Sequence, residues 1–159
     1  MRNEKRRSAG FGLAESLVSV AFTGMALAGA FAIATATRGA AQQTALRQDL
    51  RYLAEDMFER IRIDRKNIDA YDFSLAMARA QCDAAAHPGM SDAELARQEW
   101  CLRLNDLAPY RTGENRKVRV TAPEPDQGTR VVEIALQASP NARAMPQEFI
   151  ARRIIHKPL

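Results

Sequence analysis

The chain has 159 residues, a length that allows one domain with a modest core rather than two. Its formal net charge is +4. Its mean hydropathy of −0.33 excludes a protein with many membrane spans. Residues 1–10 hold four basic residues and one acidic residue, so they carry +3 of the net charge. The rest of the chain is nearly neutral, and its composition gives no general indication of nucleic-acid binding.

The first predicted element is an apolar segment that follows the basic tip. Ser16 to Thr37 is a run of 22 residues without a charge, and as a helix it would be about 33 Å long, enough to cross a bilayer core. Such a segment fits a single-pass anchor, and it also fits a secretory signal peptide that is cut near "ATA" at 34–36. Neither interpretation explains Glu15, because an acidic residue deep in a membrane helix costs about 2.5–3.5 kcal/mol.

The letters "GFGLAE" at 10–15 offer a third interpretation. Phe11 follows Gly10, and Glu15 is the fifth residue counted from Phe11. This pattern resembles the class III signal of type IV pilins and pseudopilins. The resemblance implies that a prepilin peptidase cleaves between Gly10 and Phe11, removing a leader of residues 1–10, and that Phe11 is then N-methylated. It further implies that Glu15 pairs with the terminal ammonium of a neighbouring subunit, since the two charges stabilise each other in a low-dielectric setting.

The helical pattern continues beyond the charge-free run. Apolar residues recur at intervals of three and four, which predicts one buried stripe formed by Leu46, Leu50, Leu53, Met57 and Ile61. Opposite charges four residues apart, such as Asp56 and Arg60, are expected to pair on the other face. We therefore predict one helix from Phe11 to about Ile63, with a transmembrane or assembly part at 11–37 and an amphipathic part at 38–65.

The residues at the end of this helix make the resemblance to pilins more specific. The segment "LAEDMFERIRIDRKNIDAY" at 53–71 is similar to a segment of PilV-type minor pilins. The matching residues are Asp56, Met57, Glu59, Arg60, Arg62, Ala70 and Tyr71. We expect them to provide packing and capping charges at the end of the helix rather than a catalytic site.

Residues 66–159 are predicted to form a globular α+β region. A short helix is expected over Ser74–Ala80, and a capping box of Ser91 with Glu94 predicts a helix that ends near Leu107. Alternating polar and apolar residues predict three strands, at Lys117–Thr121, Thr129–Gln137 and Glu148–His156. The predicted fold class is therefore α+β, with a long N-terminal helix, half transmembrane and half amphipathic, packed on a small antiparallel sheet in a three-stranded meander.

The two cysteines, Cys82 and Cys101, both follow the apolar segment. An even number of cysteines beyond a membrane span favours a disulfide in an oxidising compartment. A zinc site that adds His87 and His156 is the alternative, and the irregular spacing of the four residues disfavours it.

No phosphate-binding loop, zinc-protease motif or redox dithiol motif occurs in the sequence, so we expect no enzyme, cofactor or metal. The resemblance implies a minor type IV pilin that initiates or modifies a pilus for adhesion, twitching motility or DNA uptake. A minor pseudopilin of a type II secretion system and a membrane-anchored periplasmic binding module that never enters a filament are the alternatives.

The same resemblance implies the location and the partners. The leader would be cytoplasmic, the helix would span the inner membrane, and the C-terminal region would be periplasmic before it enters a pilus. Expected partners are major and minor pilins that contact the N-terminal helix, the prepilin peptidase, the inner-membrane assembly platform and the inner membrane itself. DNA binding by the basic residues Arg143, Arg152, Arg153 and Lys157 is disfavoured, because the strand pattern places Arg152 and Arg153 on opposite faces.

Overall fold

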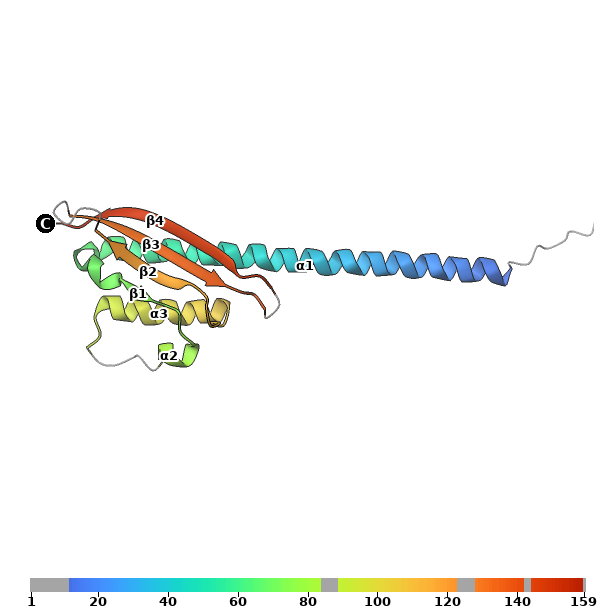
Figure 1. Ribbon diagram of the computed structural model, residues 1–159, viewed down its shortest axis with the longest axis horizontal. Helices are drawn as coiled ribbons and strands as arrows, with labels where there is room; N and C mark the ends of the chain where they lie inside the picture. The colour runs from blue at the N-terminus through green and yellow to red at the C-terminus, as the bar shows by residue number, and fades with distance from the viewer. Residues whose placement is uncertain (1–11, 84–88, 123–127, 142–143, 159) are drawn as a thin grey trace, which may run out of the picture. The chain divides into compact units, whose positions relative to one another are not determined.

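The structure is a computed structural model that describes residues 12–83, 89–122, 128–141 and 144–158. It divides into two compact units, Met1–Ala41 and Gln42–Leu159, which we describe separately. The elements in chain order are α1 (Leu13–Ile63), the 3-10 helix η1 (Arg65–Tyr71), β1 (Phe73–Ser74), α2 (Arg79–Asp83), α3 (Asp92–Leu107), β2 (Arg116–Thr121), β3 (Thr129–Ala138) and β4 (Gln147–His156) (Figure 1).

Helix α1 has 51 residues and contains both predicted parts, the charge-free run and the amphipathic stripe. In the second unit the stripe faces the core, where Leu50, Met57 and Ile61 have no exposed surface. Ala54 and Phe58 are equally buried, because each directly follows a stripe residue and lies beside it on the helix face. The buried stripe of α1 is thus wider than the three- and four-residue spacing of its apolar residues predicts.

The four strands form one antiparallel sheet in the order β1-β2-β3-β4. Ile134 in the central part of β3 pairs with Val118 on one side and with Ala151 on the other. Alternation along β3 directs Val132, Ile134 and Leu136 into the core, and all three are fully buried. The sheet, α1 and α3 therefore share one hydrophobic core, which confirms the α+β fold class.

Helix α3 begins with the predicted capping box. The Ser91 hydroxyl accepts a hydrogen bond from the Glu94 backbone N–H, and the Glu94 carboxylate accepts one from the Ser91 N–H. Trp100, which is fully buried, extends from α3 and lies 6.0 Å from Tyr71 between ring centroids. The capping box thus sets the start of the helix that carries the largest core side chain.

Ion pairs connect α3 to α1 along the exposed edge of this core. Asp56 accepts from Arg103 at 2.8 Å, and Arg60 donates to Glu99 at 2.6 Å. The expectation that Asp56 and Arg60 pair with each other along α1 is therefore wrong. Packing of α3 beside α1 brings opposite charges closer than the helix repeat does, and the spacing along one helix cannot reveal this.

Two local expectations also differ from the structure. The sheet has four strands rather than three, because Phe73 and Ser74 pair with β2 and the Leu75 N–H donates to the Arg116 carbonyl at 2.8 Å. The short helix expected over Ser74–Ala80 is α2, which begins only at Arg79. A two-residue strand shows no alternation that a sequence pattern could detect.

A buried ion pair closes the connection from α3 to β2. The Arg116 side chain has no exposed surface, and its Nη2 donates to a Glu114 carboxylate oxygen at 2.7 Å. The same Nη2 also donates to the Ala108 carbonyl at 2.9 Å, and Nε of Arg116 donates to the Gln137 carbonyl at 2.9 Å. Burial lowers the pKa of Arg116 below its usual value, while the Glu114 carboxylate opposes this shift.

Candidate functional site

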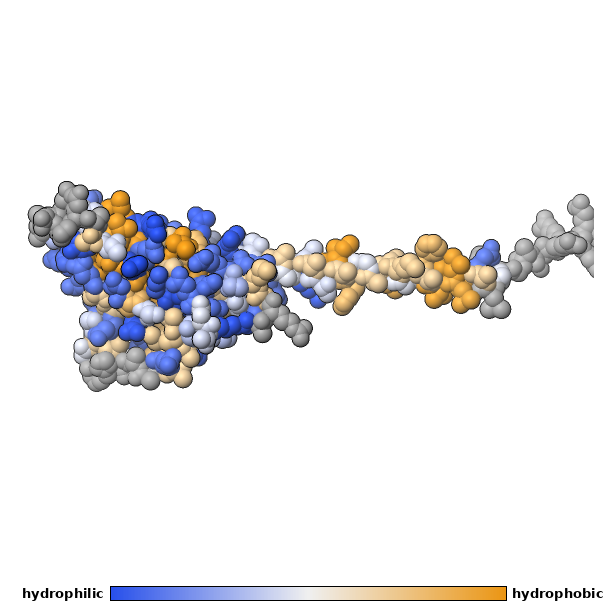
Figure 2. Space-filling view, in the orientation of Figure 1, coloured by the Kyte–Doolittle hydropathy of each residue, from blue (hydrophilic) through white to orange (hydrophobic). Residues whose placement is uncertain are grey.

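The candidate site is the charge-free part of α1 in the first unit, whose large apolar side chains are exposed. Their exposed fractions are 53–72 %, and they are Leu17, Val18, Val20, Phe22, Met25, Leu27, Phe31 and Ile33. Figure 2 shows this part of the helix mostly in orange and tan. An apolar surface of this size indicates a membrane or a protein partner. By length and composition, the helix is able to span a membrane.

The hydroxyl side chains in this part of α1 bond back to the helix itself. Ser19 donates to the Glu15 carbonyl at 2.9 Å, Thr23 to the Ser19 carbonyl at 2.8 Å, and Thr37 to the Ala34 carbonyl at 3.0 Å. Such bonds satisfy the hydroxyl donors without water. These polar residues are therefore compatible with a lipid or an apolar helix as the partner.

Glu15 lies in the first turn of α1 and has a role within the chain. Its carboxylate accepts a hydrogen bond from the N–H of Gly12, the residue that precedes the helix, at 3.3 Å. Gly12 has no hydroxyl with which to cap the helix, and Glu15 provides the reciprocal half of a capping box. The negative charge is also favourable at this end of the helix dipole. This capping role was not predicted from the sequence, although the spacing of Gly12 and Glu15 is that of a capping box.

Gly10 and Phe11 lie outside the described residues. Cleavage between them, methylation of Phe11 and pairing of Glu15 with the N-terminus of a neighbouring subunit therefore stay predictions. The two roles of Glu15 are compatible, because a carboxylate has two oxygens and can accept several hydrogen bonds.

Small residues interrupt the apolar surface at Gly24, Ala28 and Gly29. Apart from the neighbouring turns of the helix itself, a Cβ atom added at either glycine would meet no atom of the described residues within 4 Å. Packing within the described part of the chain therefore does not require the glycines, although each costs about 1 kcal/mol of helix propensity relative to Ala. Small residues spaced in this way let a second helix approach closely.

The predicted disulfide joins Cys82 of α2 to Cys101 of α3, with 5.9 Å between their Cα atoms. Because the two sulfurs are bonded to each other, they do not form the thiolate pair of the zinc alternative, and His87 lies outside the described residues. Asn105, one helical turn after Cys101, donates to the carbonyls of Cys101 and Met77 at 2.9 and 3.1 Å. Sequence reasoning missed Asn105; the signal was a polar residue four positions after a cysteine on the buried face of a helix.

The segment at 53–71 joins helix α1 to the rest of the second unit. Met57 and Tyr71 are fully buried, and the Tyr71 hydroxyl donates to Asp64 at 3.0 Å. Burial, together with the hydrogen bond and the charge of Asp64, raises the pKa of Tyr71. Glu59 and Arg62 form an exposed pair at 2.7 Å, while Ala70 is exposed. This segment thus provides packing and charge pairing, as its sequence indicates.

The basic residues considered for DNA binding are paired with carboxylates. Arg152 pairs with Glu133 and Arg153 with Glu55, so the two arginines contact different elements. Lys157 pairs with Asp69 at 2.7 Å, and Arg143 lies outside the described residues. These three candidates therefore contact different elements, which favours ordinary surface charge at these positions over a nucleic-acid site.

The first unit thus presents an apolar helix whose hydroxyl groups bond to its own backbone and whose first turn carries one carboxylate, Glu15, that caps the helix. The second unit presents an α+β fold with one disulfide. Within the described part of the chain, no group of three or more His, Cys, Asp or Glu residues could hold a metal ion. Comparisons of the chain with protein-family models, with curated proteins and with solved structures gave no match.

Proposed function

We propose that this protein is a minor type IV pilin, a structural subunit that helps to initiate or modify a pilus. The observation that carries the proposal is the first unit: an exposed apolar helix of membrane-spanning length with a single carboxylate, Glu15, in its first turn. A plain anchor has no use for that carboxylate beyond the helix cap. In a pilus it would pair with the N-terminal ammonium of the next subunit.

The second unit supports the same proposal from other residues. The amphipathic half of α1 is built into an α+β domain, so one helix carries both the apolar surface and part of the domain core. The Cys82–Cys101 disulfide fits an oxidising compartment such as the periplasm. A pilin needs this combination, since the helix enters the filament and the domain stays in water.

The proposal assigns each predicted site residue a step. The prepilin peptidase would cleave between Gly10 and Phe11 on the cytoplasmic side of the inner membrane, and Phe11 would be N-methylated. The assembly platform would then draw the helix out of the bilayer. During this step Glu15 would exchange its exposed position for a paired one, which favours the correct register of the incoming helix.

Incorporation into filaments tests the proposal. The epitope-tagged chain is expressed in a bacterium with type IV pili, and sheared filaments are assayed for the tag. We expect the wild-type chain in the sheared fraction, and we expect Glu15→Gln to reduce its amount by about tenfold, because a lost charge pair in a low-dielectric setting costs at least about 1.4 kcal/mol. Glu15→Asp, which keeps the charge, is the matched control.

A wild-type chain that stays in the membrane fraction would contradict the proposal and favour an anchored binding module. Incorporation only into the pseudopilus of a type II secretion system would instead favour the pseudopilin alternative. In either case the amount of chain in the membrane is measured first, so that poor expression is not mistaken for failed assembly.

A further inference from the structure

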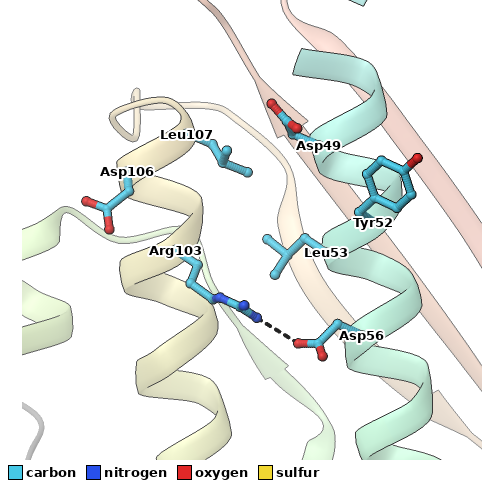
Figure 3. A pocket seen from close by; sticks show the side chains of 7 residues that line it. All are labelled: Asp49, Tyr52, Leu53, Asp56, Arg103, Asp106 and Leu107. Atoms are coloured by element: carbon cyan, nitrogen blue, oxygen red, sulfur yellow. Dashed lines mark hydrogen bonds and ion pairs between the residues drawn. The ribbon is translucent and has the colours of Figure 1, made fainter. Parts of the chain in front are cut away.

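The second unit has a groove between α1 and α3 that is lined by acidic and aromatic side chains (Figure 3). We call it the acidic groove; Asp49, Tyr52 and Asp56 line it from α1, and Arg103, Asp106 and Leu107 line it from α3. Its lining residues include three carboxylates and one guanidinium, which gives them a net charge of −2. Its charged and apolar groups together form a surface suited to a basic side chain with an aliphatic stem.

One carboxylate of the acidic groove is available to a partner. Asp56 is paired with Arg103, and Asp106 is paired with Arg79. Asp49 is exposed, and its side chain has no hydrogen-bond or ion-pair partner within the part of the chain that the structure describes. The ring of Tyr52, which is 72 % exposed, lies on the same helix one turn further along (Figure 3). Tyr52 thus offers an exposed aromatic ring on α1 at the rim of the groove.

A second groove lies between α1 and β4 and carries the opposite charge. We call it the basic groove; Arg47 and Arg51 line it from α1, and Glu148, Phe149 and Ile150 line it from β4. The two arginines are exposed, are one helical turn apart, and have no ion-pair partner among the residues described. Ile150 is 52 % exposed beside them. The net charge of these residues is +1.

We propose that the acidic groove of one copy of this chain receives Arg47 and Arg51 of a second copy. The complementary charges argue for a second copy, because the chain itself supplies both the unpaired carboxylate and the unpaired guanidinium groups. Arginine suits the acidic groove better than lysine, since its planar guanidinium binds a carboxylate in a bidentate way and stacks on a tyrosine ring. Complementary charge also favours fast and selective encounter of the two surfaces.

The two grooves are different surfaces, so the contact is heterologous. Each copy that binds through its acidic groove keeps a free basic groove, and the contact can repeat without closing. A contact that repeats in this way suits a filament, and this use of the contact rests on the proposed function. The existence of the contact is inferred only from residues of the second unit.

A charge-exchange experiment on the full chain tests the proposal. Two copies with different fluorescent labels are purified in detergent, and their dissociation constant is measured by energy transfer. Arg51→Glu changes the basic groove from +1 to −1, and Asp49→Lys with Asp106→Asn changes the acidic groove from −2 to +1. We expect either variant alone to weaken self-association by about tenfold, as for the loss of one close interfacial charge pair.

Mixing the two variants gives the decisive result. In the mixture, the reversed groove of each variant meets a groove of opposite sign on the other, so we expect association within about twofold of the wild type. Lys66→Glu, an exposed substitution outside both grooves, is the matched control and should leave association unchanged. The urea midpoint of each variant is measured to exclude unfolding.

Two results would overturn the proposal: single variants that associate as the wild type does, or a mixture that stays as weak as its components. Capture of a different basic protein by the acidic groove, without self-association, would also overturn it. The outcome is independent of the proposed function. A chain that is not cleaved at Gly10 but shows the rescue keeps the contact and loses the pilus, while a cleaved chain without rescue keeps the pilus and loses the contact.

Discussion

Loss of Arg116 would disturb the second unit strongly, because it is a buried charge with several hydrogen-bond partners. We expect Arg116→Met to lower the free energy of unfolding by about 3–5 kcal/mol, since Glu114 then stays buried without its counter-charge. Urea denaturation in detergent measures the change. Arg119→Met, at an exposed position of the same strand, should change stability by less than about 0.5 kcal/mol. Equal effects of the two substitutions on the free energy of unfolding would contradict a stabilising role of the buried pair of Arg116 and Glu114.

Asp69 makes the stability of the second unit dependent on pH. Its carboxylate accepts from Arg130 at 2.6 Å and from Lys157 at 2.7 Å, and these hydrogen bonds hold the pKa of Asp69 below its usual 3.8. A lowered pKa in the folded state stabilises the fold above the pKa of the unfolded chain, and this contribution is lost as the pH falls through the folded value.

We therefore expect Asp69→Asn to destabilise the protein at pH 7 by less than about 1 kcal/mol per ion pair, because the carboxylate is half exposed. The difference between the variant and the wild type should shrink as the pH falls below about 4. Urea midpoints at pH 7, 5 and 3 measure this. A difference that stays constant over this range would show that the pairs do not contribute through charge.

At the scale of elements, periodic segments are those that the sequence predicts well. The stripe of α1, the capping box of α3 and the alternation of β3 each repeat a physical rule over several residues, and all three appear in the structure. The strand β1 and the residue at which α2 begins depend on contacts with β2 and α3, which are distant in sequence. No local pattern therefore indicates them. The same holds for Asn105 and for the pairing of α1 charges with α3.

The disulfide is expected to hold α2 against α3 rather than to support the whole sheet. Replacing Cys82 and Cys101 by Ala should lower the free energy of unfolding by about 3 kcal/mol, the chain-entropy value for a loop of this size. Hydrogen exchange should show the protection of α2 lost, while that of β2, β3 and β4 is kept. Loss of protection throughout the sheet would contradict a local role.

Gly24 tests whether the charge-free part of α1 packs against other helices. Gly24→Leu removes a glycine from a helix at a position where an added Cβ has open space among the described residues, so it should strengthen the isolated helix by up to about 1 kcal/mol. We nevertheless expect filament incorporation to fall, because a larger side chain separates closely packed helices. Gly39→Leu, another open helix position, is the control. Normal incorporation of Gly24→Leu would count against close packing.

At the scale of the whole molecule, two different kinds of surface belong to one chain. The first unit offers an apolar helix that suits a membrane and a bundle of helices, and the second offers a folded domain with charged grooves. The fold class could be predicted from the sequence, because burial periodicity specifies it. The proposed assembly role rests on a resemblance alone, because cleavage between Gly10 and Phe11 would need another protein and no pattern within the chain reports on it.

The most direct test of this account is the N-terminus and intact mass of the membrane-extracted chain, determined with and without an active prepilin peptidase. We predict a chain that starts at methylated Phe11 when the peptidase is present and at Met1 when it is absent. A chain that starts at Met1 in both cases would contradict the pilin assignment and leave Glu15 with its helix-capping role alone. A start beyond Ala36 would instead identify the apolar segment as a cleaved signal peptide.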